Sequence, residues 1–335
     1  MDAFAESPFA LLDVHVSVRL VTDLVHEDDA LCLALTCRAL RDALGARFPA
    51  CPRAGGRAVA ELAARVSADG VLDLSHDDDD SSDEGDGGDD DGGGLRALPE
   101  GFGRLAYLPG PGLRKLILSH NENLAALPAG LWTLAGLEEL DLDCCGLVAL
   151  PEGMEGLARL RVLNLGQNGN LTALPAGLWT LVGLEELYLH GCGLTALPEG
   201  IGALVGLRKL ILGYNKFENL TALPVGLWTL AALEELHLSY CGLRALPEEM
   251  EGLVGLRKLD LSYNKELTVL PAGLGRLRNL EELNLRRCPG WQALDALMKR
   301  EGLPALLLLL LLQRGQARLD HLAAQGGEPA AGEAG

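Results

Sequence analysis

The chain has 335 residues, of which 48% are hydrophobic and 22% charged, a balance that allows folding without lipid. Only 4% are aromatic and 42 residues are glycine, so the core must be aliphatic, and it is chiefly leucine. The formal net charge of −19 argues against a nucleic-acid or anionic-membrane binder, because such proteins neutralise phosphates with basic patches. We expect neither of these partners.

The N-terminal residues 1–6 are acidic and precede no apolar run with a small-residue cleavage site, which argues against a secretory signal. The continuous apolar run at residues 305–312 is far shorter than the roughly 20 residues that span a bilayer. Eight cysteines in a chain that we expect not to be exported indicate reduced thiols. We therefore expect a cytoplasmic protein, with the nucleus as the alternative compartment.

Residues 9–48 carry leucines at mostly helical spacings and end before Pro49, which predicts two or three short helices. Residues 28–42 resemble the second half of an F-box, in which an apolar helix leads into a turn with cysteine and basic residues. The Leu-Pro opening of that family is missing, and Leu40 stands where its tryptophan is expected. Two interpretations stay open for this segment, namely a docking module for a Skp-type adaptor and a simple helical cap.

Residues 71–75 and 95–105 match two parts of a unit that recurs later in the chain, and residues 77–94 interrupt them. This insertion contains ten acidic residues with Ser and Gly and no apolar side chain, so nothing in it offsets the entropy of ordering. We expect a disordered loop. Residues 58–65, ahead of it, predict a helix that covers the first edge of the repeats.

Eight consecutive units follow, and each begins with L-x-x-L-x-L-x-x followed by Asn or Cys. Successive units start 24, 23, 24, 23, 26, 23 and 24 residues apart. Their first residues are Leu113, Leu137, Leu160, Leu184, Leu207, Leu233, Leu256 and Leu280. The L-x-L core predicts a short strand, and the L-P tract and G-L-W-T-L stretch predict a helical return.

Unit by unit, this pattern resembles the leucine-rich repeat, and its L-P-x-x-L form resembles plant Ras-group proteins, Ras-pathway scaffolds and disease-resistance receptors. The resemblance implies an α/β solenoid, a horseshoe with a concave parallel β-sheet and helical caps at both ends. It also implies an intracellular, non-enzymatic scaffold that binds a protein partner on the concave face, with a role in signalling. The runner-up function is an F-box-type substrate receptor of a ubiquitin ligase.

The ninth position of the units alternates between Asn and Cys without exception, which we interpret as a structural ladder. Its members are Asn121, Cys145, Asn168, Cys192, Asn215, Cys241, Asn264 and Cys288. Thiols on alternate rungs lie roughly 10 Å apart and cannot share one metal ion. Position two alternates between Arg and Glu, so each Arg is expected between Glu residues of adjacent rungs, in a stripe that neutralises itself.

Positions five, seven and eight take no part in the Arg/Glu alternation, and in the later units they carry aromatic residues. We predict the partner-binding site there. Its residues are Tyr188, His190, Tyr214, His237, Tyr240 and Tyr263. Trp132, Trp179 and Trp228 recur on the return segment, where packing is the first interpretation and a convex docking stripe the alternative. The sequence has no catalytic, nucleotide-binding or metal-binding motif, so we expect no enzyme activity and no cofactor.

Residues 291–300 and 304–324 predict helices that cap the last unit, followed by an unfolded tail. The sequence thus predicts three parts: a helical module at 1–55, a solenoid at 56–302 and a cap with tail at 303–335. We expect a monomer.

Deletion of residues 77–94, with two glycines closing the gap, should leave the fold intact because the insertion has no apolar anchor. The thermal midpoint of the deletion variant checks this. A fall of more than about 5 °C would show that the acidic segment is structural.

Overall fold

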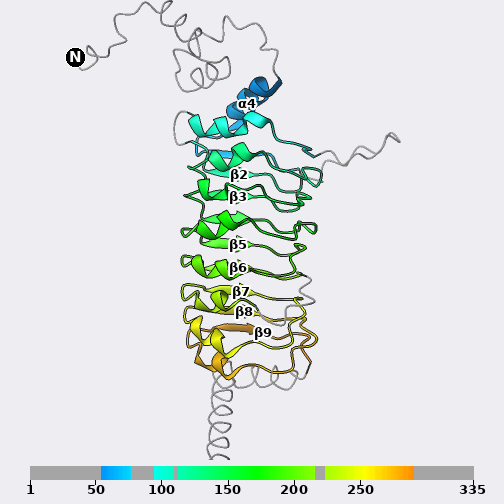
Figure 1. The fold of residues 1–335 in the computed structure, drawn as a ribbon, viewed down its shortest axis with the longest axis vertical. Coiled ribbons are helices and arrows are strands. Elements are labelled where there is room, and N and C mark those ends of the chain that lie inside the picture. Colours follow the sequence, from blue (N-terminus) through cyan, green and yellow to red (C-terminus); the bar gives the residue numbers. More distant parts are fainter. Residues whose placement is uncertain (1–53, 77–93, 109–111, 216–222, 290–335) are drawn as a thin grey trace, which may run out of the picture.

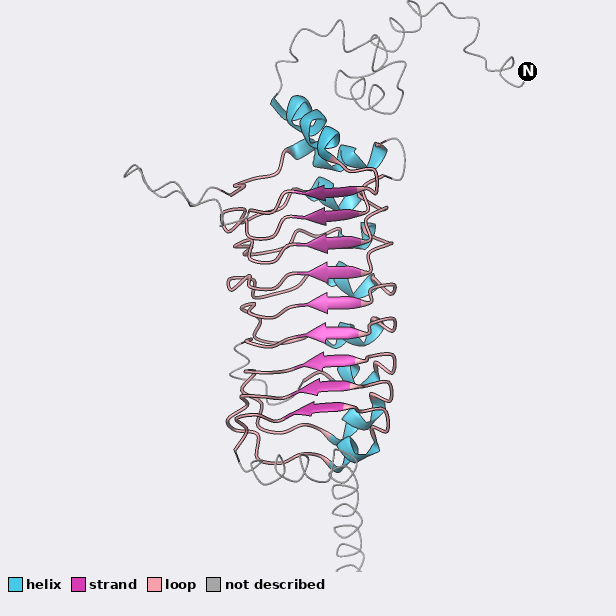
Figure 2. Cartoon of the chain, turned by 180° about the vertical axis from the view of Figure 1, so that it is seen from behind, coloured by secondary structure: helices cyan, strands magenta, loops and turns pink. Residues whose placement is uncertain are grey.

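In a computed structural model, residues 54–76, 94–108, 112–215 and 223–289 are described. They form rungs stacked along the long axis of the molecule (Figure 1). The strands lie on one face and the short helices on the opposite face (Figure 2). The expected leucine-rich-repeat solenoid is therefore confirmed.

Nine strands form one parallel sheet in sequence order, each pairing with the next. They are β1 Val71–Asp73, β2 Lys115–Ile117, β3 Glu139–Asp141, β4 Val162–Asn164, β5 Glu186–Tyr188, β6 Lys209–Ile211, β7 Glu235–His237, β8 Lys258–Asp260 and β9 Glu282–Asn284. The pairing matches equivalent leucines, such as Leu116 with Leu140. Because every central leucine points inward, a one-residue slip would expose the whole leucine row, so the pattern fixes the register.

The return segments are 3-10 helices, as the expected helical return requires. They are η2 Glu100–Tyr107, η3 Ala129–Thr133, η4 Met154–Gly156, η5 Ala176–Thr180, η6 Glu199–Ala203, η7 Val225–Thr229, η8 Glu248–Gly252 and η9 Ala272–Arg276. A proline precedes each except η4, which follows Gly153 at φ 105°. Proline suits a helix start because it presets φ and lacks an N–H that the first turn leaves unpaired.

Leucine side chains fill the space between the sheet and the 3-10 helices, where burying each contributes about 2 kcal/mol. Trp132 and Trp228 are 3% exposed and belong to this core, while Trp179 is partly buried against it. The packing interpretation of the tryptophans therefore holds. A convex docking stripe has no support from side chains that are turned into the core.

The interrupted unit forms one rung. Strand β1 pairs with β2, and the chain resumes at Leu95, whose N–H donates to Asn121 Oδ1 at 2.7 Å. Leu147 donates to Asn168 in the same way, at 2.9 Å. Helix α4, Ala54–Arg65, contains the expected helix 58–65 and packs against η2, so it covers the edge of this rung.

Several predictions fall outside the described residues. These are the F-box-like segment at 9–48, most of the acidic insertion and the C-terminal helices at 291–300 and 304–324. The three-part division of the chain also stays a prediction.

Each Asn of the ladder brackets the backbone of two rungs. Asn168 Nδ2 donates to the carbonyls of Leu142 at 2.9 Å, on the preceding rung, and Leu165 at 2.8 Å, on its own rung. Its Oδ1 accepts from the N–H groups of Cys145 at 3.2 Å and Leu147 at 2.9 Å. Asn264 repeats all four contacts four rungs further on. The amide thus satisfies buried backbone groups that would otherwise be unpaired.

Each Cys does less. Cys192 Sγ donates to Leu165 O at 3.2 Å, and Cys145 and Cys288 make the equivalent contact at 3.1 Å. Burial raises the pKa of Cys145, Cys192 and Cys241 to about 12, so these thiols stay protonated. A protonated, buried thiol is a packing group with one weak hydrogen bond.

The ladder predicts that Asn168→Ala destabilises the protein more than Cys192→Ala does. The Asn variant leaves several buried backbone groups unpaired and should lose about 3 kcal/mol, against about 1 kcal/mol for the weak thiol hydrogen bond. Denaturant titration measures both losses, and Asn264→Ala with Cys241→Ala repeats the comparison. Equal losses, or a larger loss for the Cys variants, would contradict this account.

Candidate functional site

The six residues predicted to bind a partner come together on four consecutive rungs, from β5 to β8. Tyr188 and His237 end their strands at position five, and His190 lies at position seven. The other three form what we call the tyrosine row, at position eight: Tyr214, Tyr240 and Tyr263. Positions three, five and seven point away from the core and, together with the tyrosine row at the strand ends, form what we call the sheet face, the expected concave side.

The tyrosine row is a stack of rings. The centroids of Tyr214 and Tyr240 are 4.5 Å apart with an interplanar angle of 18°, and those of Tyr240 and Tyr263 are 4.1 Å apart at 14°. Tyr214 is 58% and Tyr240 38% exposed, so the stack lies in solvent. Desolvation by its neighbours raises the pKa of Tyr240, and a hydrogen bond with Tyr263 adds to this.

All three tyrosines have left-handed backbone conformations, with φ of 61°, 54° and 61°. The chain turns out of each strand at position eight, where Gly191 and Arg287 also have positive φ, at 62° and 65°. Such a conformation is costly for bulky residues and free for glycine. His120, Cys144 and Gln167 adopt it at position eight as well, so the left-handed turn belongs to the repeat and places the three tyrosines in line.

Tyr188 is held by its neighbours. Its hydroxyl donates to Glu186, and Lys209 Nζ lies 5.3 Å from its ring centroid. Burial, followed by Glu186, raises the pKa of Tyr188. Burial lowers the pKa of His237, so its imidazole is neutral at pH 7. Tyr188 and His237 thus lie on the sheet face at the ends of β5 and β7, beside the tyrosine row.

His190 reaches across one rung to Asp143, a residue that the sequence analysis left outside the predicted site. His190 Nε2 is 3.6 Å from Asp143 Oδ1, and their side chains are 27% and 19% exposed. A Cβ at Gly166, on the intervening rung, would collide with both. The signal in the sequence is this glycine at position seven, between Asp and His at the same position of the neighbouring units.

The surroundings of Asp143 disfavour its charged form. Burial raises the pKa of its carboxyl, and His190 only partly opposes this. Neither Asp143 Oδ1 nor His190 Nδ1 has a hydrogen-bond partner among the described residues. Both atoms are buried, so the pair has unmet hydrogen-bonding capacity beneath the surface of the sheet face.

The Arg and Glu residues of position two form separate pairs. Each Arg contacts the Glu of the following rung: Arg114 with Glu138 at 2.7 Å, Arg161 with Glu185, Arg208 with Glu234 at 3.1 Å, and Arg257 with Glu281 at 2.8 Å. The sequence predicted an Arg between two Glu neighbours, and the structure corrects this to one carboxylate per Arg. Exposed pairs of this kind contribute about 0–1 kcal/mol each.

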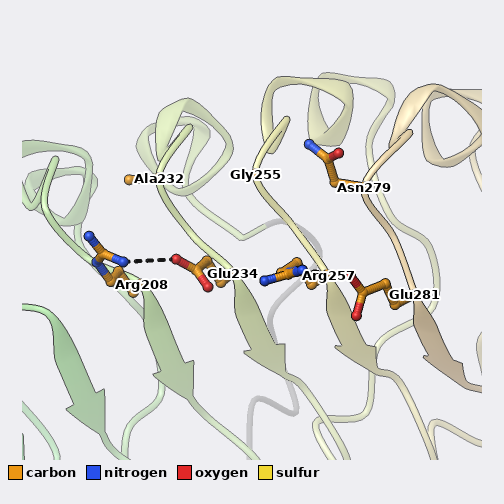
Figure 3. A pocket seen from close by; sticks show the side chains of 7 residues that line it. All are labelled: Arg208, Ala232, Glu234, Gly255, Arg257, Asn279 and Glu281. Carbon is orange, nitrogen blue, oxygen red and sulfur yellow. Dashed lines mark hydrogen bonds and ion pairs between the residues drawn. The ribbon is translucent and has the colours of Figure 1, made fainter.

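A pocket of about 400 Å³ opens where strands β6 to β9 begin, at the end of the strands opposite the tyrosine row. Figure 3 shows Arg208 and Arg257 alternating with Glu234 and Glu281 along it. Both arginines are already in ion pairs, and Asn279 Nδ2 donates to Val254 O at 2.8 Å. The lining is therefore polar and internally satisfied.

The described residues contain no group of three metal-ligating side chains. Nor does any helix among them have the length and apolar character needed to cross a membrane.

Asp143→Asn should raise the thermal midpoint at pH 7. The folded state binds the carboxyl proton more tightly than the unfolded chain, so the stability from this group is present at low pH and is lost as pH rises through the folded pKa. The gain from the amide should therefore shrink as pH falls toward about 4.

Asp73→Asn is the matched control with the opposite sign, because hydrogen bonds from Ser75 lower the pKa of Asp73. This variant should lose stability at pH 7. Thermal melts from pH 3 to pH 8 measure both. A midpoint that falls at pH 7 for Asp143→Asn would show that the buried carboxylate is stabilising.

Comparisons with known proteins agree with this geometry. The family model described as leucine rich repeat matches residues 135–194 and 231–289. The leucine-rich-repeat domain of the type III effector XCV3220 (XopL) is 27% identical with a TM-score of 0.55, and the match covers 86% of this chain and 94% of that domain. Comparison with curated protein sequences finds no match.

Two further solved structures are similar at lower TM-scores. The Leptospira interrogans leucine-rich-repeat protein LIC12759 is 27% identical with a TM-score of 0.41 over 57% of this chain, which spans 64% of that protein. The plant peptide hormone receptor RGFR1, in complex with RGF2, is 25% identical with a TM-score of 0.43 over 56% of this chain and 30% of the receptor. The repeat pattern, the nine-stranded sheet and the family match together identify residues 135–194 and 231–289 as leucine-rich repeats within a leucine-rich-repeat solenoid.

Proposed function

We propose that this protein is a non-enzymatic scaffold that binds a protein partner through the sheet face. The binding residues are Tyr188, His190, Tyr214, His237, Tyr240 and Tyr263. The observation that carries this proposal is the tyrosine row, whose rings are stacked on one another and lie in solvent. Tyrosine is a frequent hot-spot residue because it combines a large apolar area with a hydroxyl group.

The surrounding surface supports this choice of site. Leucine-rich-repeat domains are generally protein-interaction modules. Among the described side chains, the tryptophans lie in or against the core and the Arg–Glu pairs satisfy one another, whereas the tyrosine row offers exposed aromatic contact area. The five described cysteines form no disulfide with one another, which suits a reducing compartment, and we propose a cytoplasmic role in signalling.

The second candidate function is that of a substrate receptor of a ubiquitin ligase. The F-box-like residues 28–42 favour it, and in that case residues 9–48 would dock on a Skp-type adaptor while the repeats select the target.

Tyr240→Ala should weaken partner binding by about 1–3 kcal/mol, because it removes the central ring of the row. Arg161→Ala should change binding little, since that side chain only pairs with Glu185. Tyr107→Ala is the matched control, because Tyr107 is 62% exposed on η2, away from the sheet. The affinity of each full-length variant for the captured partner is the measurement, with folding checked by circular dichroism.

A Tyr240→Ala variant that binds like the parent would contradict the proposed site. Loss of binding on removal of residues 1–50, together with capture of a Skp-type adaptor by the parent, would favour the ubiquitin-ligase function instead.

A further inference from the structure

The tyrosine stack has one closed end and one open end. The guanidinium of Arg286 lies 5.9 Å from the ring centroid of Tyr263, so a cation closes the end near β9. At the other end, no described ring or cation contacts the free face of Tyr214. This free face is consistent with the 58% exposure of Tyr214, the higher of the two values above.

The next member of the column, on the rung of β5, is Gly191. It shares the positive φ of the tyrosines, at 62° against 61° for Tyr214, but it has no side chain to continue the stack. The nearest neighbour of a Cβ built there would be Gln167 Oε1, at 2.6 Å, which is the movable end of an exposed side chain. The column therefore has a slot without a ring, one rung wide, beside Tyr214, and a ligand group that enters it must displace the Gln167 amide that lies over Gly191.

The chemistry of the closed end indicates what the open end accepts. A guanidinium is flat enough to stack on a phenol ring and is attracted by the ring quadrupole. Beyond the slot lies Asp143, whose Oδ1 is buried and faces His190 Nε2 at 3.6 Å, and a positive charge nearby would favour the ionised carboxylate. Asp141, on the same rung, adds a further negative charge.

Charge along the sheet face is therefore polarised. At positions five, seven and eight, the rung of β3 presents Asp141 and Asp143, whereas the rung of β9 presents Arg286 and Arg287; position three carries a glutamate on both rungs. Between these rungs, positions five, seven and eight carry one acid, Asp260, whose Oδ1 is engaged by the N–H of Ser262 at 2.8 Å. With rungs about 4.8 Å apart, the two charged ends are separated by about 29 Å, the span of about nine extended residues.

We propose that the sheet face binds an extended segment of a partner protein that crosses the strands, with basic residues toward β3 and acidic residues toward β9. An arginine of this segment stacks on Tyr214 over Gly191, and a second basic residue meets Asp143. Its acidic end meets Arg286 and Arg287. This inference rests on the proposed function and adds the chemistry of the partner.

The test is selection of random dodecapeptides, displayed on phage, with the full-length protein as bait. The selected peptides should carry an arginine and a second basic residue toward one end and acidic residues about six positions from the arginine. Synthetic copies should bind about tenfold more weakly when the arginine is replaced by alanine.

Variants locate each end of the segment. Arg286→Glu with Arg287→Glu should abolish selection of the acidic end and weaken the parent's peptides about tenfold or more. Arg159→Glu with Arg278→Glu is the matched control, because it changes net charge equally at exposed residues outside the strands and should leave selection unchanged. Gly191→Tyr fills the slot in a conformation that tyrosine adopts on the next rung, so it should abolish only the preference for arginine.

Three results would overturn the inference: no selected peptides, selected peptides without separated charges, or the same selection by the Arg286/Arg287 charge reversal. If any of these occurs while Tyr240→Ala still weakens the captured partner, the proposed function stands without this partner chemistry. If Tyr240→Ala also has no effect, both fall.

Discussion

The side-chain amide of asparagine at every second rung organises the backbone on which the sheet face is built. Asn168 and Asn264 each hold carbonyls of two successive rungs and N–H groups of the preceding one. The chain leaves each strand immediately before this position, in a left-handed turn. Because the amides fix that exit, the side chains at position eight repeat with the spacing of the rungs and can stack.

The rungs with Asn and the rungs with Cys differ in length and in the hydrogen bonds that they supply. Complete Asn units are 24 or 26 residues long and Cys units 23 residues. In the Asn units the extra chain closes a turn, such as that from Leu171 N to Asn168 O at 2.9 Å. In the Cys units Glu199 and Glu248 accept from the first N–H groups of the following 3-10 helix. Side chains of one rung thus satisfy backbone groups of the adjacent rung, as expected for a repeat array stabilised by nearest-neighbour contacts.

The sequence predicts those features of the fold that recur in every unit. The strict spacing of the leucines establishes the strands, their register and the interrupted rung, since one unit predicts the next. The sequence does not predict which side chains of different rungs contact one another. Arg161 has two possible Glu partners in the sequence and contacts only Glu185. The Asp143–His190 pair depends on the missing side chain of Gly166, and the stacking of the tyrosines depends on a backbone conformation that their own preferences oppose.

The central claim is that binding takes place on the sheet face, at the strand ends from β5 to β8. Hydrogen exchange of the full-length protein, with and without its captured partner, tests this most directly. The account predicts slower exchange at residues 186–191, 209–215, 235–241 and 258–264, with no change in helices η5 to η8. Protection of those helices with unchanged exchange at the strand ends would contradict it.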